Sequence, residues 1–374
     1  MRLERLELNN YRNIENTLLI PHPNVNVIFG KNAQGKTNLL ESIWLCSGNK
    51  SFRGAKENQL IQFQKPIFRI EMDFSDRERI QHISYTAGER RKISVNGVPC
   101  KTLSELAGEF YCVVFNPDDL DIVKDGPSCR RQFLDTAISQ IKPIYGRYLI
   151  QYENVLEQRN VLLKEIRKQS YSEDMLDIWD MQLAKLGTIL SIFRKDYLEK
   201  LNTVAQKIYS GFSGGKEQIE MEYRSTIYPE NTELKIYSDE LIDKYKMALE
   251  EAREDDIRLR STTKGIHRDD FEIKIDDFSA KQFGSQGQQR SCAITLKLSE
   301  AALLKNITGE DPVVLLDDVM SELDQQRQHY ILNKVKDFQV FITCCDLLNT
   351  LQLEEGKIFY VENGIFAEKN KNDL

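Results

Sequence analysis

The spacing of apolar residues changes twice along the chain. Apolar and polar residues alternate over 67–74, 80–85 and 92–95, which predicts half-buried strands, and Asn96-Gly97 indicates a tight turn after the third. From residue 144 onward, apolar residues recur every three or four positions, the period of an amphipathic helix. Near the C-terminal end, short apolar runs return. The pattern predicts an α/β protein with an N-terminal β-rich lobe and an inserted helical segment.

The helical segment contains two long apolar stripes, which predict two helices packed antiparallel. A break at 211–215 follows them, and a third helical stretch is expected over 238–260. The same stripes would fit the core of an ordinary helical subdomain equally well. We assign 126–261 to an inserted helical arm domain, and 1–125 with 262–374 to the domain that the arm interrupts. The stripes consist of Tyr145, Tyr148, Tyr152, Val155, Leu162 and Ile166, then Leu176, Trp179, Leu183, Leu186, Leu190, Phe193, Tyr197 and Val204.

A glycine-rich loop lies between an apolar strand, 24–29, and a helix-like run, 38–45. This strand, loop and helix order is the context of a phosphate-binding loop, in which backbone N–H groups and the helix N-terminus surround phosphate. Lys36 is predicted to reach the β- and γ-phosphates of ATP, and the Thr37 hydroxyl to bind Mg²⁺. The loop consists of Gly30, Lys31, Asn32, Ala33, Gln34, Gly35, Lys36 and Thr37.

An apolar run at 312–316 ends in two carboxylates, Asp317 and Asp318. A buried parallel strand has this composition, and its C-terminal end is where α/β proteins bind nucleotides. Asp317 is predicted to complete the Mg²⁺ shell, and Asp318 to orient and polarise the attacking water. Taken alone, Asp317 and Asp318 could simply form an acidic turn after a strand. Beside the phosphate-binding loop, this interpretation is weaker than a role at the nucleotide.

A Gly-Ser-x-Gly turn at 284–287 opens a helical run over 291–305. Alone, such a turn often only caps a helix. In the order loop, turn and Asp-Asp strand, followed by 321–324, these segments resemble the head domain of ABC-type ATPases of DNA repair and chromosome maintenance. The resemblance implies that the turn of one subunit completes the γ-phosphate site of another, so that ATP joins two chains in a homodimer. The implied nucleotide-binding residues of the turn are Ser285, Gly287 and Gln288.

The whole chain resembles the RecF family of bacterial recombination mediators. The resemblance implies a cytoplasmic, nucleoid-associated ATPase that dimerises on ATP and binds double-stranded DNA at gapped duplex junctions. It also implies cooperation with RecR and RecO in loading RecA, with no chemistry on DNA. Arg12 would then approach the nucleotide, although an exposed arginine at a strand end is the commoner alternative. The segments that carry the resemblance are 8–14, 30–41, 51–53, 113–117, 126–127, 130–135 and 265–270.

Three positions depart from the general pattern of such heads. The acid after the metal-binding aspartate is often glutamate in fast ATPases, whereas Asp318 is one methylene shorter, which predicts slow hydrolysis. The histidine that senses the γ-phosphate is missing, and Thr343 or Cys345 stands in its place. The glutamine of the usual Q-loop is absent from 115–117, which leaves Asn116 as the candidate in its place.

Composition limits the other possibilities. The net charge of −7 argues against a protein covered in basic surface, but DNA binding needs only a local basic face. Seven cysteines without C-x-x-C spacing predict neither a zinc site nor a disulfide framework. No signal peptide or apolar run of membrane-spanning length is visible, so we expect a soluble protein of a reducing compartment with no membrane partner.

Two basic groups are candidates for phosphate contacts with DNA: Lys50, Arg53 and Lys56, and then Arg130 and Arg131. Such charges usually form only a solvated face. No base-reading motif is visible, which predicts sequence-independent binding. Two other functions stay open: the ATPase subunit of a nuclease-associated anti-phage system, which would need a separate cleavage partner, and a transporter head, which would replace the helical arm with a smaller subdomain.

Overall fold

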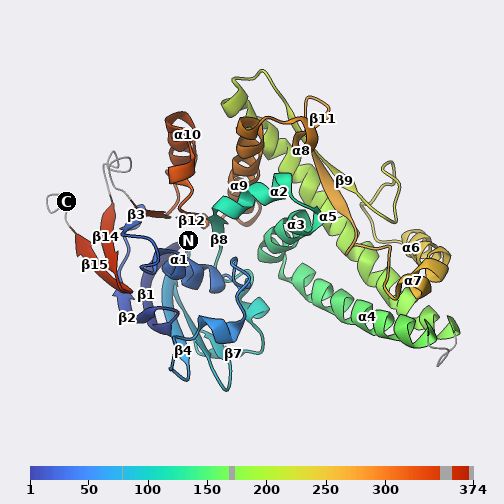
Figure 1. Ribbon diagram of the computed structural model, residues 1–374, viewed down its shortest axis with the longest axis horizontal. Helices are drawn as coiled ribbons and strands as arrows, with labels where there is room; N and C mark the ends of the chain where they lie inside the picture. Colours follow the sequence, from blue (N-terminus) through green and yellow to red (C-terminus); the bar gives the residue numbers. More distant parts are fainter. Residues whose placement is uncertain (78, 168–172, 346–355, 370–374) are drawn as a thin grey trace. The chain divides into compact units, whose positions relative to one another are not determined.

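In the computed structural model, the chain forms two compact units (Figure 1). The head unit consists of Met1–Leu120 and Ala293–Leu374, and the arm unit consists of Asp121–Cys292. The predicted arm, 126–261, lies within the arm unit, which also contains the signature-like turn at 284–287. The structure describes residues 1–77, 79–167, 173–345 and 356–369.

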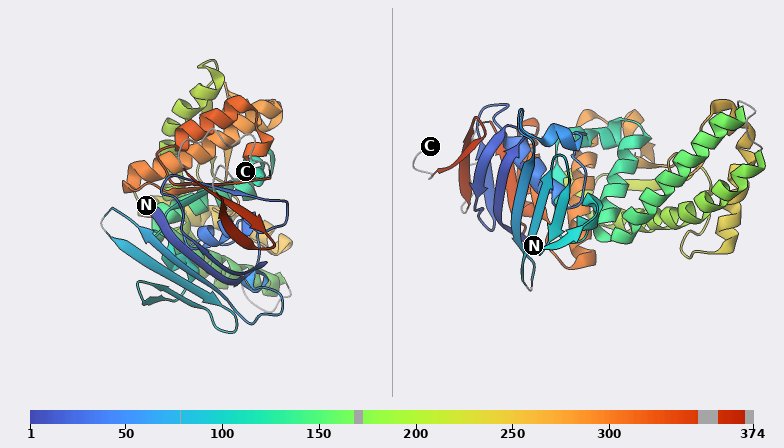
Figure 2. Two further views of the ribbon diagram at one scale, coloured as in Figure 1. Left: turned by 90° about the vertical axis from the view of Figure 1, so that its left-hand side faces the viewer. Right: turned by 90° about the horizontal axis from the view of Figure 1, so that it is seen from below.

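The head unit contains two six-stranded sheets. The first is antiparallel, and its strands lie side by side, blue to cyan, in Figure 2. The second is parallel except at one edge, where the last two strands of the chain pair antiparallel. The antiparallel order is β2 (Ile14–Leu19), β1 (Arg2–Tyr11), β4 (Phe68–Ser75), β5 (Ile80–Ala87), β6 (Lys92–Val95), β7 (Val98–Cys100). The parallel order is β15 (Ile365–Lys369), β14 (Lys357–Glu362), β3 (Val25–Phe29), β13 (Val340–Cys344), β12 (Val313–Asp317), β8 (Cys112–Phe115).

One hydrophobic core joins both sheets of the head unit. Leu8 and Phe74 enter it from the antiparallel sheet, and Leu315 enters it from β12. Helix α1 lies between them and contributes Leu40. The predicted strands and the Asn96-Gly97 turn are confirmed, with ends shifted by one or two residues. The helical elements are α1 (Lys36–Leu45), η1 (Glu57–Leu60), η2 (Leu103–Leu106), η3 (Pro117–Leu120), η5 (Met320–Glu322), α10 (Gln325–Val335) and α9 (Gln286–Thr308), which begins in the arm unit.

The arm unit is mainly helical, and its two long helices run side by side (Figure 1). The third predicted stretch, 238–260, is two helices separated at Ala252. None of the helices in the described ranges has the length and apolar character to cross a membrane. The elements are α2 (Asp121–Lys124), α3 (Pro127–Ile141), α4 (Pro143–Arg167), η4 (Glu173–Met175), α5 (Leu176–Ser213), β9 (Ile219–Arg224), α6 (Asp239–Glu251), α7 (Arg253–Leu259), β10 (Asp270–Ile275), β11 (Phe278–Ser279) and α8 (Ala280–Phe283).

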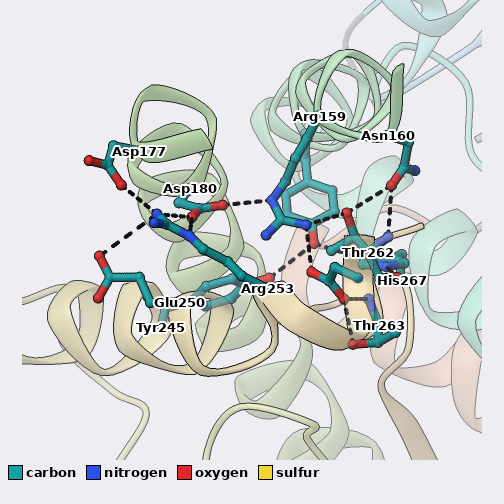
Figure 3. A network of polar contacts seen from close by, with 12 residues as sticks. Arg159, Asn160, Asp177, Asp180, Tyr245, Glu250, Arg253, Thr262, Thr263 and His267 are labelled. Carbon is teal, nitrogen blue, oxygen red and sulfur yellow. Dashed lines mark hydrogen bonds and ion pairs between the residues drawn. The ribbon is translucent and has the colours of Figure 1, made fainter. Parts of the chain in front are cut away.

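A buried ionic network holds the arm unit together (Figure 3). Arg159 of α4 is fully buried; its Nε donates to Asp180 Oδ1 of α5 at 2.6 Å, and its Nη1 donates to Asp256 Oδ2 of α7 at 2.6 Å. Nη1 also reaches Thr262 Oγ1, and Arg253 pairs with the second oxygen of Asp180. Removing one partner of such a buried pair typically costs about 3–5 kcal/mol, because the other charge is left without compensation.

The motif at 265–270 joins the same network. His267 contacts the Tyr152 hydroxyl through Nδ1 and the Thr262 carbonyl through Nε2, each at 3.0 Å. Asp269 accepts hydrogen bonds from Tyr223 Oη and from the backbone N–H and Oγ1 of Thr226. Every one of these contacts stays within the arm unit, so this motif serves as a structural corner of the arm.

Burial lowers the pKa of His267 to about 4, and the nearby charges of Arg268 and Arg131 add to the effect. An unfolded chain binds this proton near pH ~6.5, so between that value and about 4 the unfolded state holds more protons. The stability that comes from a neutral His267 is therefore complete above pH ~6.5 and falls as the pH decreases.

We predict that lowering the pH from about 7 to about 5 costs the arm unit about 2 kcal/mol through this group. Urea unfolding followed by tryptophan fluorescence checks it in a Trp44→Phe background, because the signal then comes from Trp179 of α5 in the arm unit. His267→Gln should flatten the pH dependence, whereas the exposed His329→Gln should leave it unchanged. Equal slopes for all three proteins would contradict the assignment.

Candidate functional site

The glycine-rich loop connects β3, in the interior of the parallel sheet, to the N-terminus of α1. Gly30 and Gly35 have φ angles of 158° and 115°, which L side chains rarely adopt, and a Cβ on Gly30 would lie 2.4 Å from the Val361 carbonyl oxygen. Gly35 is the N-cap of α1, and as a glycine it has no side chain to cap the helix. The first N–H groups of α1 are therefore the donors that an anion meets at this loop.

The Lys36 side chain lies along the inside of the loop. Its ammonium donates to the carbonyl oxygens of Gly30 at 2.6 Å and Lys31 at 3.0 Å, and it contacts Cys345 Sγ at 3.5 Å. Lys36 is buried. The charge is thus held at the centre of the loop, where a phosphate would be its natural counter-ion.

The rest of the loop is held by its neighbours. Asn32 Oδ1 contacts the Cys345 thiol at 2.9 Å, and the Ala33 carbonyl accepts from Asn13 Nδ2. Gln34 accepts from the Asn363 backbone N–H through Oε1, at 2.6 Å. Lys31 is exposed.

A chain of hydroxyls and carboxylates links the loop to the ends of β12 and β13. Thr37 Oγ1 and Thr343 Oγ1 both donate to Asp317 Oδ1, at 2.9 Å and 2.8 Å. Burial raises the pKa of Asp317, while the Thr343 and Thr37 hydroxyls and the charge of Arg53 act in the opposite direction. A buried carboxylate beside a hydroxyl is a hard oxygen donor set, which fits Mg²⁺. Thr37 and Asp317 are thus placed together as the sequence predicted.

Asp318 has a left-handed backbone conformation, with φ of 53°. Its N–H donates to Thr343 Oγ1 at 2.9 Å, and Ser321 Oγ donates to the Asp318 carbonyl oxygen at 2.8 Å. Non-glycine residues seldom adopt such a φ, and strained positions of this kind cluster at functional sites. The two bonds hold the carboxylate at the C-terminal edge of the parallel sheet.

The two residues considered in place of the missing histidine take different positions. Thr343 is buried, and its hydroxyl is hydrogen-bonded to both Asp317 and Asp318. Cys345 is exposed and contacts the loop residues Lys36 and Asn32. Asn116 follows β8 directly after Phe115, which pairs with Leu316. Its Oδ1 is buried and has no hydrogen-bond partner among the residues that the structure describes, an arrangement that favours an additional ligand or water.

The signature-like turn forms the N-terminus of α9, in the arm unit. The Ser285 N–H donates to Gln288 Oε1 at 2.8 Å, and the Gln288 N–H donates to Ser285 Oγ at 3.2 Å, the reciprocal pattern of a capping box. Gln288 also donates to Glu217. The helix begins at Gln286, earlier than the predicted 291, because the turn containing Gly287 is itself its first turn. Ser285 is exposed.

Arg12 is bound by an acid that the sequence analysis did not single out. Its Nε and Nη2 donate to the two oxygens of Glu41, at 2.9 Å and 2.8 Å. Glu41 is fully buried in α1 and also accepts from the Tyr11 hydroxyl and from Ser51. The signal in the sequence was an acid on an otherwise apolar helix face, one turn after Thr37. The closeness of Arg12 to a nucleotide stays a prediction.

The first basic group divides into two kinds. Lys50 and Lys56 are exposed. Arg53 is exposed as well, but it donates to Asn38 Oδ1 of α1 at 2.9 Å, and its charge opposes the rise that burial causes in the pKa of Asp317. Arg53 is therefore linked to Asp317, whereas the two lysines form a basic surface without such a link.

The second basic group lies in the arm unit. Arg130 is buried; it donates to both oxygens of Asp270, at 2.7 Å and 2.9 Å, and to the carbonyls of Ile122 and Asp125. Its guanidinium is thus committed to the protein interior and is not presented to a phosphate. Arg131 is half-buried and donates to the Asp269 carbonyl at 2.9 Å.

Comparisons with known proteins identify the family of the chain. The family model for the RecF/RecN/SMC N terminal domain matches residues 2–365. The DNA replication and repair protein RecF of Clostridium perfringens is 41% identical over 369 residues, covering 97% of this chain and 99% of that protein.

Two solved structures are similar over the full length. The recombination mediator protein RecF with ATPrS in the RecFOR pathway has a TM-score of 0.92 and 38% identity, covering 98% of each chain. The corresponding RecF-ATP structure has a TM-score of 0.90 and 37% identity, covering 99% of this chain and 98% of that one. The predicted α/β ATPase head with a β-rich lobe and an inserted helical arm is confirmed, and the chain belongs to the RecF family.

Proposed function

We propose that the head unit binds ATP and Mg²⁺ and that ATP binding switches the chain between a monomer and a dimer. The observation that carries the proposal is the 2.9 Å contact between Thr37 Oγ1 and Asp317 Oδ1, at the end of the loop whose carbonyl oxygens hold the Lys36 ammonium. Lys36 would contact the β- and γ-phosphates, and the two oxygens would bind the metal, with the buried Asn116 Oδ1 as a further oxygen nearby. The solved relatives are RecF structures with ATP and ATPrS, which supports the choice of nucleotide.

Hydrolysis would depend on Asp318. The Thr343 hydroxyl and Ser321 hold this residue, so its carboxylate would orient a water rather than bind the metal. The metal would neutralise charge on the phosphates, and the chain's own groups would position the water. The short side chain of aspartate favours slow turnover, as a switch requires.

The dimer would place Ser285, Gly287 and Gln288 of one subunit over the phosphates bound to another. Ser285 is exposed, and the N-terminus of α9 presents backbone N–H groups suited to an anion. Charge-assisted hydrogen bonds from such a turn to the γ-phosphate would be present with ATP and lost with ADP. ATP would thus act as part of the interface.

For the biological role, we propose an ATP-switched, sequence-independent DNA-binding mediator of DNA repair and replication in the cytoplasm. The names of the relatives support it: a DNA replication and repair protein, and a recombination mediator of the RecFOR pathway. Double-stranded DNA near single-stranded gaps would be the ligand, RecR and RecO the partners, and loading of RecA the outcome. Lys50 and Lys56 would contribute phosphate contacts.

We predict that Lys36→Ala weakens ATP binding roughly 10- to 100-fold, because it removes a charge-assisted contact made in the ground state. Asp318→Asn should keep ATP affinity and lower the hydrolysis rate by roughly 10²- to 10⁴-fold. Asparagine also tolerates the left-handed backbone. Fluorescent-nucleotide titration and phosphate release measure the two effects, with the exposed Lys101→Ala as control. Hydrolysis by Asp318→Asn at the wild-type rate would show that this carboxylate is not the water-orienting group.

A non-hydrolysable ATP analogue, but not ADP, should double the mass from 43.5 kDa in light scattering. Ser285→Arg should prevent this while leaving nucleotide binding intact, since a bulky side chain blocks the approach of the second subunit. Ser210→Arg, at an exposed position on α5, is the matched control. A constant monomer mass for the wild-type chain at high concentration would rule out the shared site.

Lys50→Glu with Lys56→Glu should weaken duplex binding and reduce the slope of log K against log salt by about 2, one unit for each lost phosphate contact. Arg53 is left unchanged because it lies near the nucleotide cluster. Lys207→Glu with Lys216→Glu makes the same charge change at exposed positions of the arm unit. An identical loss of duplex affinity in both double variants would show that only the net charge matters. Lys50 and Lys56 would then not be part of the DNA site.

A further inference from the structure

A single aromatic side chain stands out on the surface of the head unit. Among the large apolar side chains of the described residues, Phe63 has the greatest exposed fraction, 87%. A solitary exposed apolar residue is ordinary on a protein surface and carries no argument by itself. The backbone that presents Phe63 and the charges around it distinguish this residue from the others.

Phe63 lies at the tip of a fixed turn between η1 and β4. The Lys65 N–H donates to the Gln62 carbonyl oxygen at 3.0 Å, and the Gln62 N–H donates to the Asn10 carbonyl oxygen at 2.8 Å. Gln64 has φ of 64°, a value that such turns normally assign to glycine or asparagine. Because the backbone is held on both sides and a residue is strained beside the ring, the turn presents Phe63 in one place.

The segment that carries this turn is basic, although the whole chain is acidic. Between residues 50 and 65 it contains four cations, Lys50, Arg53, Lys56 and Lys65, and one acid, Glu57. Glu57 is paired with a further cation, Arg91, through contacts of 2.9 and 3.0 Å. Lys65 pairs with Glu15, but both side chains are exposed, and such pairs are weak.

The exposed ring of Phe63 and the exposed Lys56 fall within the length of one DNA contact. A 3₁₀ turn rises about 2 Å per residue and an extended chain at most about 3.5 Å, so Lys56 and Phe63 are within roughly 20 Å. Phosphates recur about every 3.4 Å along each strand, so this distance covers about six nucleotides. An aromatic ring among cations is the combination with which proteins hold unpaired bases.

We infer that Phe63 stacks on an unpaired base at the boundary between duplex and single-stranded DNA; this rests on the DNA binding proposed above. Bases inside a duplex already stack on both faces, so a single ring gains contact only where a neighbour is missing. Every base has a π-face, so the contact is independent of sequence. Phe63 would therefore distinguish a gapped duplex from a continuous one, while the lysines bind both.

The test compares a gapped duplex, with 2-aminopurine as the first unpaired base, and a continuous duplex of the same length, in the ATP-bound state. Phe63→Ala should weaken gapped-DNA binding roughly 5- to 100-fold and abolish the protein-dependent change in 2-aminopurine fluorescence. Phe63→Leu, which keeps an apolar side chain without a π-face, should behave like the alanine variant, and Phe63→Trp should behave like the wild type. Binding to the continuous duplex should change by less than about twofold in all of them.

Val98→Ala is the matched control, an exposed apolar residue on β7 of the same unit. Equal affinity of the wild type and Phe63→Ala for gapped DNA, or equal losses on both DNAs, would overturn the inference while leaving the proposed function in place. A loss of ATP-dependent dimer mass in Phe63→Ala would assign the turn to contact with a second copy of the chain, and would also overturn it. Failure of the wild type to bind either DNA would instead reject the proposed DNA role, and the inference with it.

Discussion

The register of three parallel strands determines where the groups of the nucleotide site lie. β3 pairs with β13 up to Phe29 and Cys344, and β13 pairs with β12 up to Thr343 and Asp317. Side chains alternate between the faces of a sheet, so a slip of one residue would turn Asp317 away from the loop and Thr343 away from Asp317. The loop conformation, the contact between Thr37 Oγ1 and Asp317 Oδ1 and the position of Asp318 all depend on this pairing, and the shared core behind the sheet stabilises it.

In the arm unit, a buried ionic network connects three helices. Arg159, Asp180 and Asp256 are fully buried, and each charge has a partner of opposite sign on a different helix. Hydrophobic residues of similar volume would often stabilise such a position at least as well, so the network contributes directional geometry more than free energy. Because a guanidinium donates to carboxylates only in fixed directions, Arg159 constrains the relative positions of α4, α5 and α7.

Patterns that are local in the sequence predicted the strands, the loop and the Asp-Asp pair correctly, because their spacing follows the geometry of a single element. Contacts with residues far away in the sequence were not predictable in this way. Arg159 lies on the apolar stripe of α4 and is neutralised by Asp256, 97 residues away. Arg130 resembled an exposed phosphate ligand but pairs with Asp270, 140 residues away. The exposure of Phe63 was not predicted for a different reason, since an aromatic residue before a strand usually belongs to the core.

The backbone at Asp318 has a consequence for the evolution of the site. Aspartate and asparagine adopt a φ near the observed 53° more readily than longer side chains, because their short polar groups can hydrogen-bond locally. A glutamate at this position would extend its carboxylate by one methylene. It would also adopt the left-handed conformation less readily, and the hydrogen bonds with Thr343 and Ser321 would have to offset that cost. Under the proposed role of Asp318, lengthening the acid would therefore not be an isolated step toward faster hydrolysis. The rate of the proposed ATP cycle and the backbone conformation at Asp318 would change together.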